Sequence, residues 1–215
     1  MPRGLRLLFV RHAETDWNKA GRYQGCIDTR LSEAGRQQAV AVAERLRSLR
    51  LARIYTSPQA RARETAEAIA RPLDLPVFED RAFVERCHGA WEGLTVDEIE
   101  ARFPGALRKR REDPLNAVSP EGESLAAVRD RVLDRLARLE ADHGEETVCI
   151  VLHDAPLKMM LLNELGLGPE SFWKLRLSST GLSEIEIDGT RRQIGRINDT
   201  SHLNGPLVPE PHRAL

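Results

Sequence analysis

Cysteine and lysine are both scarce in this chain of 215 residues. The three cysteines, Cys26, Cys87 and Cys149, are far apart and show no spacing typical of a metal site. We therefore expect reduced thiols and a cytoplasmic protein. Lysine occurs 4 times against 28 arginines, which we interpret as compositional bias.

Long apolar runs and a strong net charge are also absent. No run approaches the length that a bilayer requires, and no long apolar stretch follows the first arginines as it would in a signal peptide. The net charge of −1 creates no field that would attract nucleic acid or an anionic membrane, so we expect neither as a partner. With 41% hydrophobic and 30% charged residues, the composition is typical of a globular protein.

No internal repeat or linker divides the chain. We predict one domain over residues 1–203 and a loose, proline-rich tail over residues 204–215. Within the domain, short apolar runs of strand length alternate with stretches of helical periodicity. This alternation favours an α/β fold.

Two of the apolar runs end in a histidine. Leu5–Val10 is followed by Arg11-His12, and Thr147–Leu152 is followed by His153. Six residues suit a buried strand better than a helix, and ligands bind at the carboxyl edge of open α/β sheets. Imidazole is nucleophilic and largely neutral at pH 7, and guanidinium binds phosphate oxygens. A single such histidine could be a structural residue that is hydrogen-bonded at a strand end beside a surface arginine. Two histidines at one sheet edge indicate a functional site.

The first motif is longer than this dipeptide. Residues 11–18 read Arg-His-Ala-Glu-Thr-Asp-Trp-Asn. The string closely resembles the signature of the histidine phosphatase superfamily, phosphoglycerate-mutase-like branch, whose usual form is Arg-His-Gly-Glu-Thr/Ser-x-Trp-Asn. Only Ala13 departs from it.

Further motifs follow in the order that this family has. They are Gln24-Gly25 with Asp28 and Leu31-Ser32, then Thr56-Ser57 with Arg61, Glu85 with Gly89 and Trp91-Glu92-Gly93, Gly122-Glu123-Ser124, His153, and Asn198 with His202-Leu203. Arg61 matches the family's arginine, whereas Arg63 does not. The second histidine departs from the usual His-Gly-Gly/Ala, because the chain has His153-Asp154-Ala155.

The resemblance implies a three-layer α/β/α fold, with helices on both faces of a doubly wound, mostly parallel sheet. It also implies a small lid over residues 86–120 and a metal-independent phosphomonoesterase without a cofactor. In the family's mechanism His12 would attack phosphorus and form a phosphohistidine, and Glu85 would protonate the leaving alkoxide.

The remaining motif residues would bind the phosphate. Arg11 and Arg61 would neutralise the dianion, His153 and Asn18 would donate further hydrogen bonds, and Gln24 and Gly25 would line the phosphate site.

Two other functions stay open. A phosphoglycerate mutase is one, although mutases of this family carry a longer segment after the Glu85 motif, and here Gly122 follows Glu85 by only 37 positions. A weakly active, phosphate-binding regulatory protein is the other, because Ala13 and Asp154 replace glycines near the anion. We expect a small phosphate ester as the ligand in either enzyme, and a homodimer is one assembly the chain could form.

Asp154 has two interpretations. It could be the proton donor, as the aspartate of a His-Asp pair is in the acid-phosphatase branch of the superfamily. Alternatively it caps a helix that begins at Ala155-Pro156, since aspartate is a preferred N-cap residue and proline is tolerated in the first turn. We favour the cap. The basic run at residues 108–111 is interpreted as a solvated face, which could attract polyanionic substrates if it overhangs the pocket. His88 is interpreted as a loop histidine, and contact with the substrate is the alternative.

Overall fold

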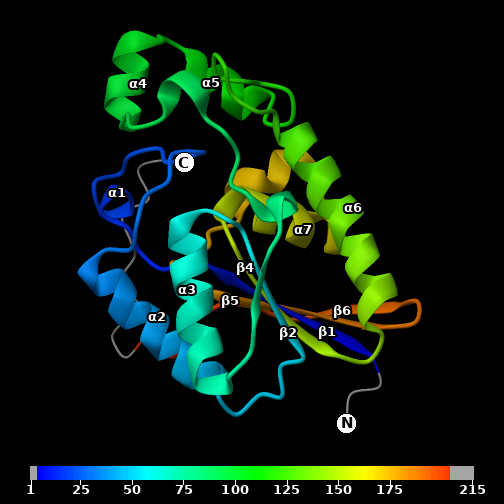
Figure 1. The fold of residues 1–215 in the computed structure, drawn as a ribbon. Coiled ribbons are helices and arrows are strands. Elements are labelled where there is room, and N and C mark those ends of the chain that lie inside the picture. The colour runs from blue at the N-terminus through cyan, green and yellow to red at the C-terminus, as the bar shows by residue number, and fades with distance from the viewer. Residues whose placement is uncertain (1–3, 204–215) are drawn as a thin grey trace.

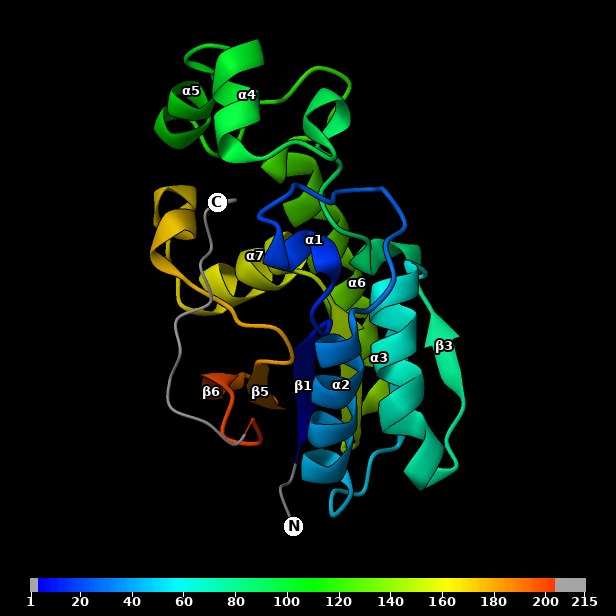
Figure 2. The ribbon, with the colours of Figure 1, turned by 90° about the vertical axis from the view of Figure 1, so that its left-hand side faces the viewer.

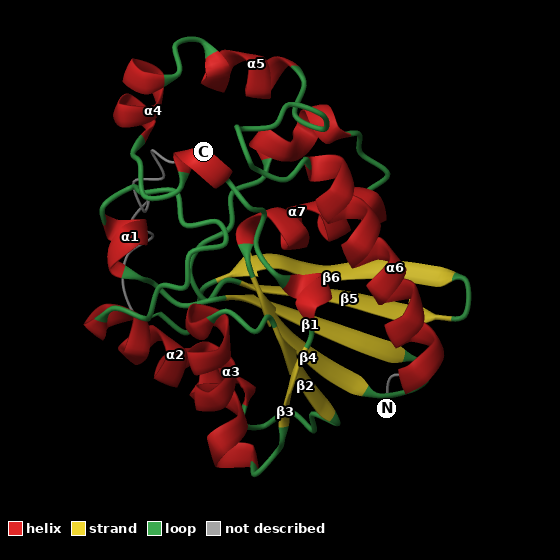
Figure 3. Cartoon of the chain, turned by 45° about the horizontal axis from the view of Figure 1, so that its top comes forward, coloured by secondary structure: helices red, strands yellow, loops and turns green. Residues whose placement is uncertain are grey.

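A six-stranded mixed sheet forms the centre of the molecule (Figure 3). The computed structural model describes residues 4–203, so the predicted tail at 204–215 lies outside the described residues. The strands lie in the order β3-β2-β4-β1-β5-β6. The first four in the chain are mutually parallel, and β5 and β6 are antiparallel to their neighbours. Their bounds are Leu5–Arg11 (β1), Arg53–Thr56 (β2), Val77–Glu79 (β3), Thr147–Leu152 (β4), Leu182–Asp188 (β5) and Arg191–Asp199 (β6).

Helices cover both faces of the sheet (Figure 1). Alternate residues of β1 separate the two sides, because side chains alternate along a strand. Leu8 and Val10 pack with α2 (Glu33–Leu46) and α3 (Ala60–Ala70), while Leu7 and Phe9 pack in a second cluster. The helices of that second cluster are α6 (Leu125–His143) and α7 (Asp154–Glu164). The predicted doubly wound, three-layer α/β/α fold is therefore confirmed.

The long helix α6 shows how the sequence specifies this packing. Its apolar residues at helical spacing are Leu125, Val128, Val132, Leu136 and Leu139, and all are buried. The Ser124 hydroxyl caps the helix by accepting a hydrogen bond from the Ala127 N–H. A single apolar stripe thus orients α6 against the sheet.

Two short helices, α4 (Val96–Arg102) and α5 (Ala106–Glu112), lie together away from the sheet, at the top of Figures 1 and 2. They belong to the segment 86–120, which the sequence predicts to be a lid. In Figure 2 the short helix α1 (Asp16–Lys19) lies between them and the sheet. Four 3₁₀ helices complete the described chain: Arg71–Leu73 (η1), Arg81–Phe83 (η2), Gly89–Trp91 (η3) and Pro169–Lys174 (η4).

The α5 helix corrects one expectation about the basic run. Arg108, Lys109 and Arg111 are exposed, as a solvated face requires, but Arg110 is only 4% exposed. Helical periodicity turns this one residue inward, toward aromatic side chains described below. Among residues 4–203, no helix combines the length and the apolar character that crossing a bilayer demands.

Candidate active site

His12 and His153 meet because β1 and β4 are parallel neighbours. Their register pairs Arg11 with Leu152, so the residues that follow each strand emerge side by side at the carboxyl edge. The His12 N–H donates to the Leu152 carbonyl at 2.9 Å, and the two imidazole centroids are 5.0 Å apart. The sequence predicts both histidines at this edge, and the structure brings them into contact.

His12 is neutral, and its tautomer is set by its own backbone. Nδ1 lies 2.7 Å from the Ala13 carbonyl, which can only accept, so the proton is on Nδ1 and Nε2 keeps its lone pair. Burial, together with the nearby charges of Arg61 and Arg11, lowers the pKa of His12 well below its ordinary value. An imidazole in this state can act as a nucleophile at neutral pH.

His153 is fully buried behind His12. Burial and the positive charge of Arg61 lower its pKa well below the ordinary value. Neither ring nitrogen has a hydrogen-bond partner among residues 4–203. Buried polar groups are rarely unsatisfied in proteins, so the His153 nitrogens have unused hydrogen-bonding capacity next to His12.

Two arginines flank the histidines. The Arg11 Nη1 donates to the Leu177 carbonyl at 2.6 Å, and the Arg61 terminal nitrogens donate to the carbonyls of Gly25 and Ile27, each at 2.9 Å. Burial lowers the pKa of Arg61 to about 10, so it stays charged at neutral pH. The terminal nitrogens of Arg61, which the sequence predicts to bind phosphate, therefore hold the loop at residues 25–27. The Nε of Arg61 has no hydrogen-bond partner in the described chain.

Glu85 faces the start of α7. Its carboxylate accepts hydrogen bonds from the main-chain N–H of Asp154 at 3.1 Å, of Ala155 at 3.2 Å and of Arg86 at 2.8 Å. Burial and the negative charge of Asp154 raise the pKa of Glu85, against the opposing effects of the Arg86 N–H and of the Arg61 and Arg11 charges. A carboxyl group with a raised pKa can carry a proton at neutral pH, as a general acid must.

The cap assigned to Asp154 is wrong. Helix α7 begins at Asp154 itself, His153 occupies the N-cap position, and no side chain of that position caps the helix. The N–H of Leu157, which an N-cap side chain at Asp154 would accept, donates to the His153 carbonyl at 3.3 Å, and Glu85 accepts the first two N–H groups of the helix. The Asp154 carboxylate instead pairs with Lys158 one turn along α7, with Nζ and Oδ2 2.9 Å apart.

Helix α1 and the loop between α1 and α2 supply the remaining predicted residues. Asn18 Oδ1 accepts from the Thr15 N–H in a capping box, which leaves its Nδ2 for other partners. Gln24 Oε1 lies 3.0 Å from the Thr15 hydroxyl. At Gly25 φ is +53° and an added Cβ would meet the Glu92 carboxylate, so the turn requires glycine.

A pocket collects nearly all of these predicted residues. Arg11, His12, Asn18, Gln24, Gly25, Arg61, Glu85 and Asp154 line it, together with Trp17, Gly21, Arg22, Tyr23 and His88. His153 is absent from the lining because the ring of His12 lies against it. The loop histidine His88 is buried, and its wall position adds one aromatic group beside Tyr23, with ring centroids 4.9 Å apart.

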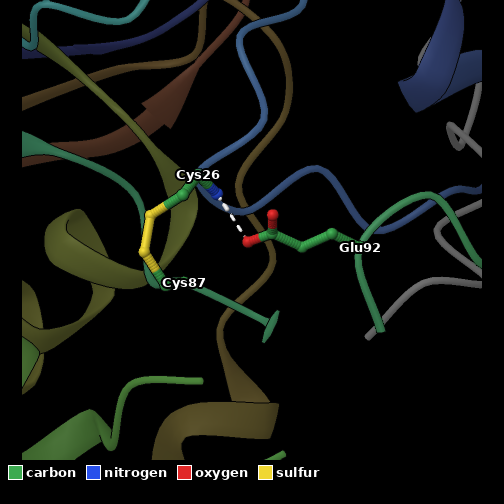
Figure 4. A group of neighbouring side chains, drawn as sticks. All are labelled: Cys26, Cys87 and Glu92. Atoms are coloured by element: carbon green, nitrogen blue, oxygen red, sulfur yellow. Dashed lines mark hydrogen bonds between the residues drawn. A yellow bond between two sulfur atoms is a disulfide. The ribbon is translucent and has the colours of Figure 1, made fainter. Parts of the chain in front are cut away.

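Cys26 and Cys87 form a disulfide beside the pocket (Figure 4). The expectation of separate, reduced cysteines is therefore wrong for this pair, because the fold joins residues that are remote in sequence. Glu92 ties the same two segments, since its Oε1 accepts from the N–H of Cys26 at 2.7 Å and of His88 at 2.9 Å. The three side chains are close enough to hold a metal ion, but the disulfide occupies both sulfurs.

Sequence motifs do not reveal two further residues around the pocket. Gln59 joins the segment of Glu85 to the loop at residues 25–27. Its Oε1 accepts from the Glu85 N–H at 2.9 Å, and its Nε2 donates to the Gly25 carbonyl at 2.8 Å. The Arg110 guanidinium lies 5.4–5.5 Å from the rings of Tyr23, Trp91 and Trp173. Both contacts are tertiary, and only the helical phase of Arg110 could have indicated its burial.

Residues 7–200 match the family model of the histidine phosphatase superfamily (branch 1). The chain belongs to this superfamily. Phosphoserine phosphatase 1 of Hydrogenobacter thermophilus is 36% identical over 211 residues, which cover 98% of this chain and 100% of that protein.

Solved structures agree with this assignment. YhfR of Bacillus stearothermophilus superposes with a TM-score of 0.88 at 34% identity, covering 93% of this chain and 99% of that one. A mycobacterial glucosyl-3-phosphoglycerate phosphatase superposes with a TM-score of 0.83 at 32% identity, covering 91% and 99%. The motif resemblance is confirmed, and the family and these relatives indicate an enzyme that hydrolyses phosphate monoesters.

Proposed function

We propose that the protein hydrolyses small phosphate monoesters through a phosphohistidine on His12. The observation that carries this proposal is the state of His12 in the pocket. Nδ1 donates its hydrogen to the Ala13 carbonyl and so holds the proton of the neutral ring, which leaves Nε2 as an unprotonated nucleophile. Arg11 and Arg61 line the same pocket and supply the positive charge that a phosphate dianion needs.

The reaction then has two steps. In the first, His12 Nε2 attacks phosphorus in line, the ester P–O bond breaks, and the leaving alkoxide takes the proton of Glu85. In the second, water attacks the phosphohistidine, Glu85 accepts a proton from that water, and inorganic phosphate leaves. His153 and Asn18 donate hydrogen bonds to the phosphoryl oxygens, and Gln24 and Gly25 shape the loop around them.

No metal enters this scheme, because arginines neutralise the dianion. Turnover should therefore be the same after exhaustive dialysis against a chelator and after addition of Mg²⁺. A phosphatase rate that requires the added ion would contradict this part of the proposal.

The relatives narrow the substrate class. They are named for phosphoserine and for glucosyl-3-phosphoglycerate, which are both phosphate esters of small metabolites. We propose a substrate of the same general kind, acted on by one domain over residues 1–203 with residues 86–120 as its lid. A homodimer and a cytoplasmic location remain predictions. Disulfides persist mainly in oxidising compartments. Titration of the thiols in protein taken directly from cells therefore tests the cytoplasmic location, because reduced Cys26 and Cys87 would agree with it.

Rapid acid quench of the enzyme with ³²P-labelled phosphoserine tests the mechanism. We expect a labelled, acid-labile protein adduct that disappears as inorganic phosphate forms. Bound substrate without label would support the regulatory binder instead. Interconversion of phosphoglycerates faster than phosphate release would support a mutase.

A further inference from the structure

Two buried carboxyl groups meet at the start of α7. Glu85 accepts the Asp154 N–H through Oε2 at 3.1 Å, and both side chains line the pocket. Glu85 is 9% exposed and Asp154 is 6% exposed. Two carboxylates in such a site repel each other when both are ionised, so their protonation is coupled.

Lys158 forms an ion pair with one of these two groups, Asp154. It is 1% exposed, and its Nζ lies 2.9 Å from Asp154 Oδ2. The same Nζ lies 4.8 Å from the centroid of the Phe172 ring, at a distance typical of a cation–π contact. A buried lysine is stable as a cation only beside an opposite charge, so the pair holds Asp154 as a carboxylate.

Other charges also act on the pair. Arg11 on β1 and Arg61 on α3 favour the anion of Glu85, Arg110 on α5 interacts with both carboxyl groups, and the guanidinium of Arg86, next in the chain, interacts with Glu85. The fixed charge of Asp154 opposes these arginines. Removing the charge of Asp154 therefore removes one of the two causes that raise the pKa of Glu85.

We propose that Lys158 assigns the two carboxyl groups different roles, keeping Asp154 as a fixed negative charge so that Glu85 holds the catalytic proton. The inference rests on the proposed function, since it concerns the acid of that reaction. Lys158 and Asp154 are positioning residues here, because they act on the leaving group only through Glu85. The sequence spacing is consistent with this ion pair, since Asp154 and Lys158 stand at i and i+4 on one helix.

The pH dependence of kcat/KM tests this role. An alkyl ester such as phosphoserine has a poor leaving group and needs a protonated Glu85, so its rate falls as pH rises past the pKa of Glu85. In Asp154→Asn the alkaline limb should move down by about one pH unit, the shift that removing a neighbouring carboxylate typically causes. With 4-nitrophenyl phosphate, whose leaving group needs no acid, the limb should stay in place.

Three further variants separate charge from structure. Lys158→Arg keeps the cation and should keep the wild-type limb. Asp154→Asn/Lys158→Met removes both charges without leaving one buried and unpaired, and its limb should move in the same direction but less far. Glu170→Gln removes an exposed negative charge from η4 and should leave the profile unchanged.

An unmoved alkaline limb in Asp154→Asn would overturn the proposal, as would equal losses on both esters. So would a loss of phosphoserine turnover in Asp154→Asn at every pH while Glu85→Gln stays active, because Asp154 would then be the acid. These outcomes differ from a failure of the proposed function, which would appear as a wild-type enzyme that forms no phosphohistidine.

Discussion

The imidazoles of His12 and His153 lie with their centroids 5.0 Å apart and their planes inclined at 56°. One follows β1 and the other β4, and only the parallel pairing of these strands brings them together. Both are neutral, because burial and Arg61 lower each pKa. Two neutral imidazoles between cationic arginines can accept a phosphoryl group and donate to it without repelling each other.

Substitution of the nucleophile should abolish turnover. His12→Ala removes the nitrogen that we propose as the nucleophile, so we expect kcat to fall below detection while the far-UV circular dichroism spectrum stays native. The side chain is at a strand end and not in the apolar core, so folding should survive. Activity within about tenfold of wild type would exclude His12 as the nucleophile.

Loss of the acid should depend on the leaving group. Glu85→Gln keeps the size of the side chain but cannot donate a carboxylic proton. We expect kcat on phosphoserine to fall by about a hundredfold or more, the usual contribution of general acid catalysis. Hydrolysis of 4-nitrophenyl phosphate should fall far less, and comparable losses on the two esters would argue against Glu85 as the donor.

The Cys26–Cys87 disulfide should stabilise the fold. The cysteines are 61 positions apart, and closing a loop of that length stabilises a protein by about 4 kcal/mol in the chain-entropy model. Reduction of the wild type should lower the free energy of unfolding in urea by up to this amount. The double variant Cys26→Ser/Cys87→Ser should match the reduced wild type and show no response to reductant.

Reduction should also affect catalysis, because the disulfide joins the loop at residues 25–27 to the segment that follows Glu85. Glu92 and Gln59 hold the same two segments, so we expect a partial loss of kcat. Equal kcat values for oxidised and reduced wild type would show that these hydrogen bonds suffice.

Local sequence patterns predicted the parts of the molecule that local patterns can determine. The apolar run Thr147–Leu152 forms β4 with those bounds, as the sequence predicts. The apolar stripe of α6, the Ser32 cap of α2 and the turn between β5 and β6 at Asp188-Gly189, where φ of Gly189 is +58°, also depend only on neighbouring residues. The two histidines were placed at the sheet edge because strand ends in parallel sheets converge.

The failures have a common physical cause. Asp154-Ala-Pro satisfies the N-cap rule by itself, but the helix begins one residue earlier, where Glu85 from a distant segment accepts the N–H groups of Asp154 and Ala155. The disulfide and the burial of Arg110 also arise from contacts between remote segments. No pattern within one element can predict such a competition.

Acid should destabilise the protein through its buried histidines. Burial is the first cause that lowers the pKa of His12, of His88 and of His153 well below 6.5. Above pH 6.5 both the folded and the unfolded chain keep these imidazoles neutral. Below it, the unfolded chain binds protons that the folded chain does not, so stability is present at high pH and lost as pH falls. Glu85 acts in the opposite direction, because its pKa is raised in the fold.

His88→Gln isolates one of these contributions. His88 has no assigned part in the reaction, and each fully shifted histidine contributes a slope of up to about 1.4 kcal/mol per pH unit below the unfolded pKa. We therefore expect the free energy of unfolding of the wild type, measured in urea, to fall as the pH is lowered from 7.5 to 5.5. The slope of this free energy against pH should be shallower in His88→Gln by up to this amount. Glu85→Gln should be steeper than the wild type, because it removes the opposing group. Identical slopes in all three proteins would mean that these groups titrate alike in the folded and unfolded chains.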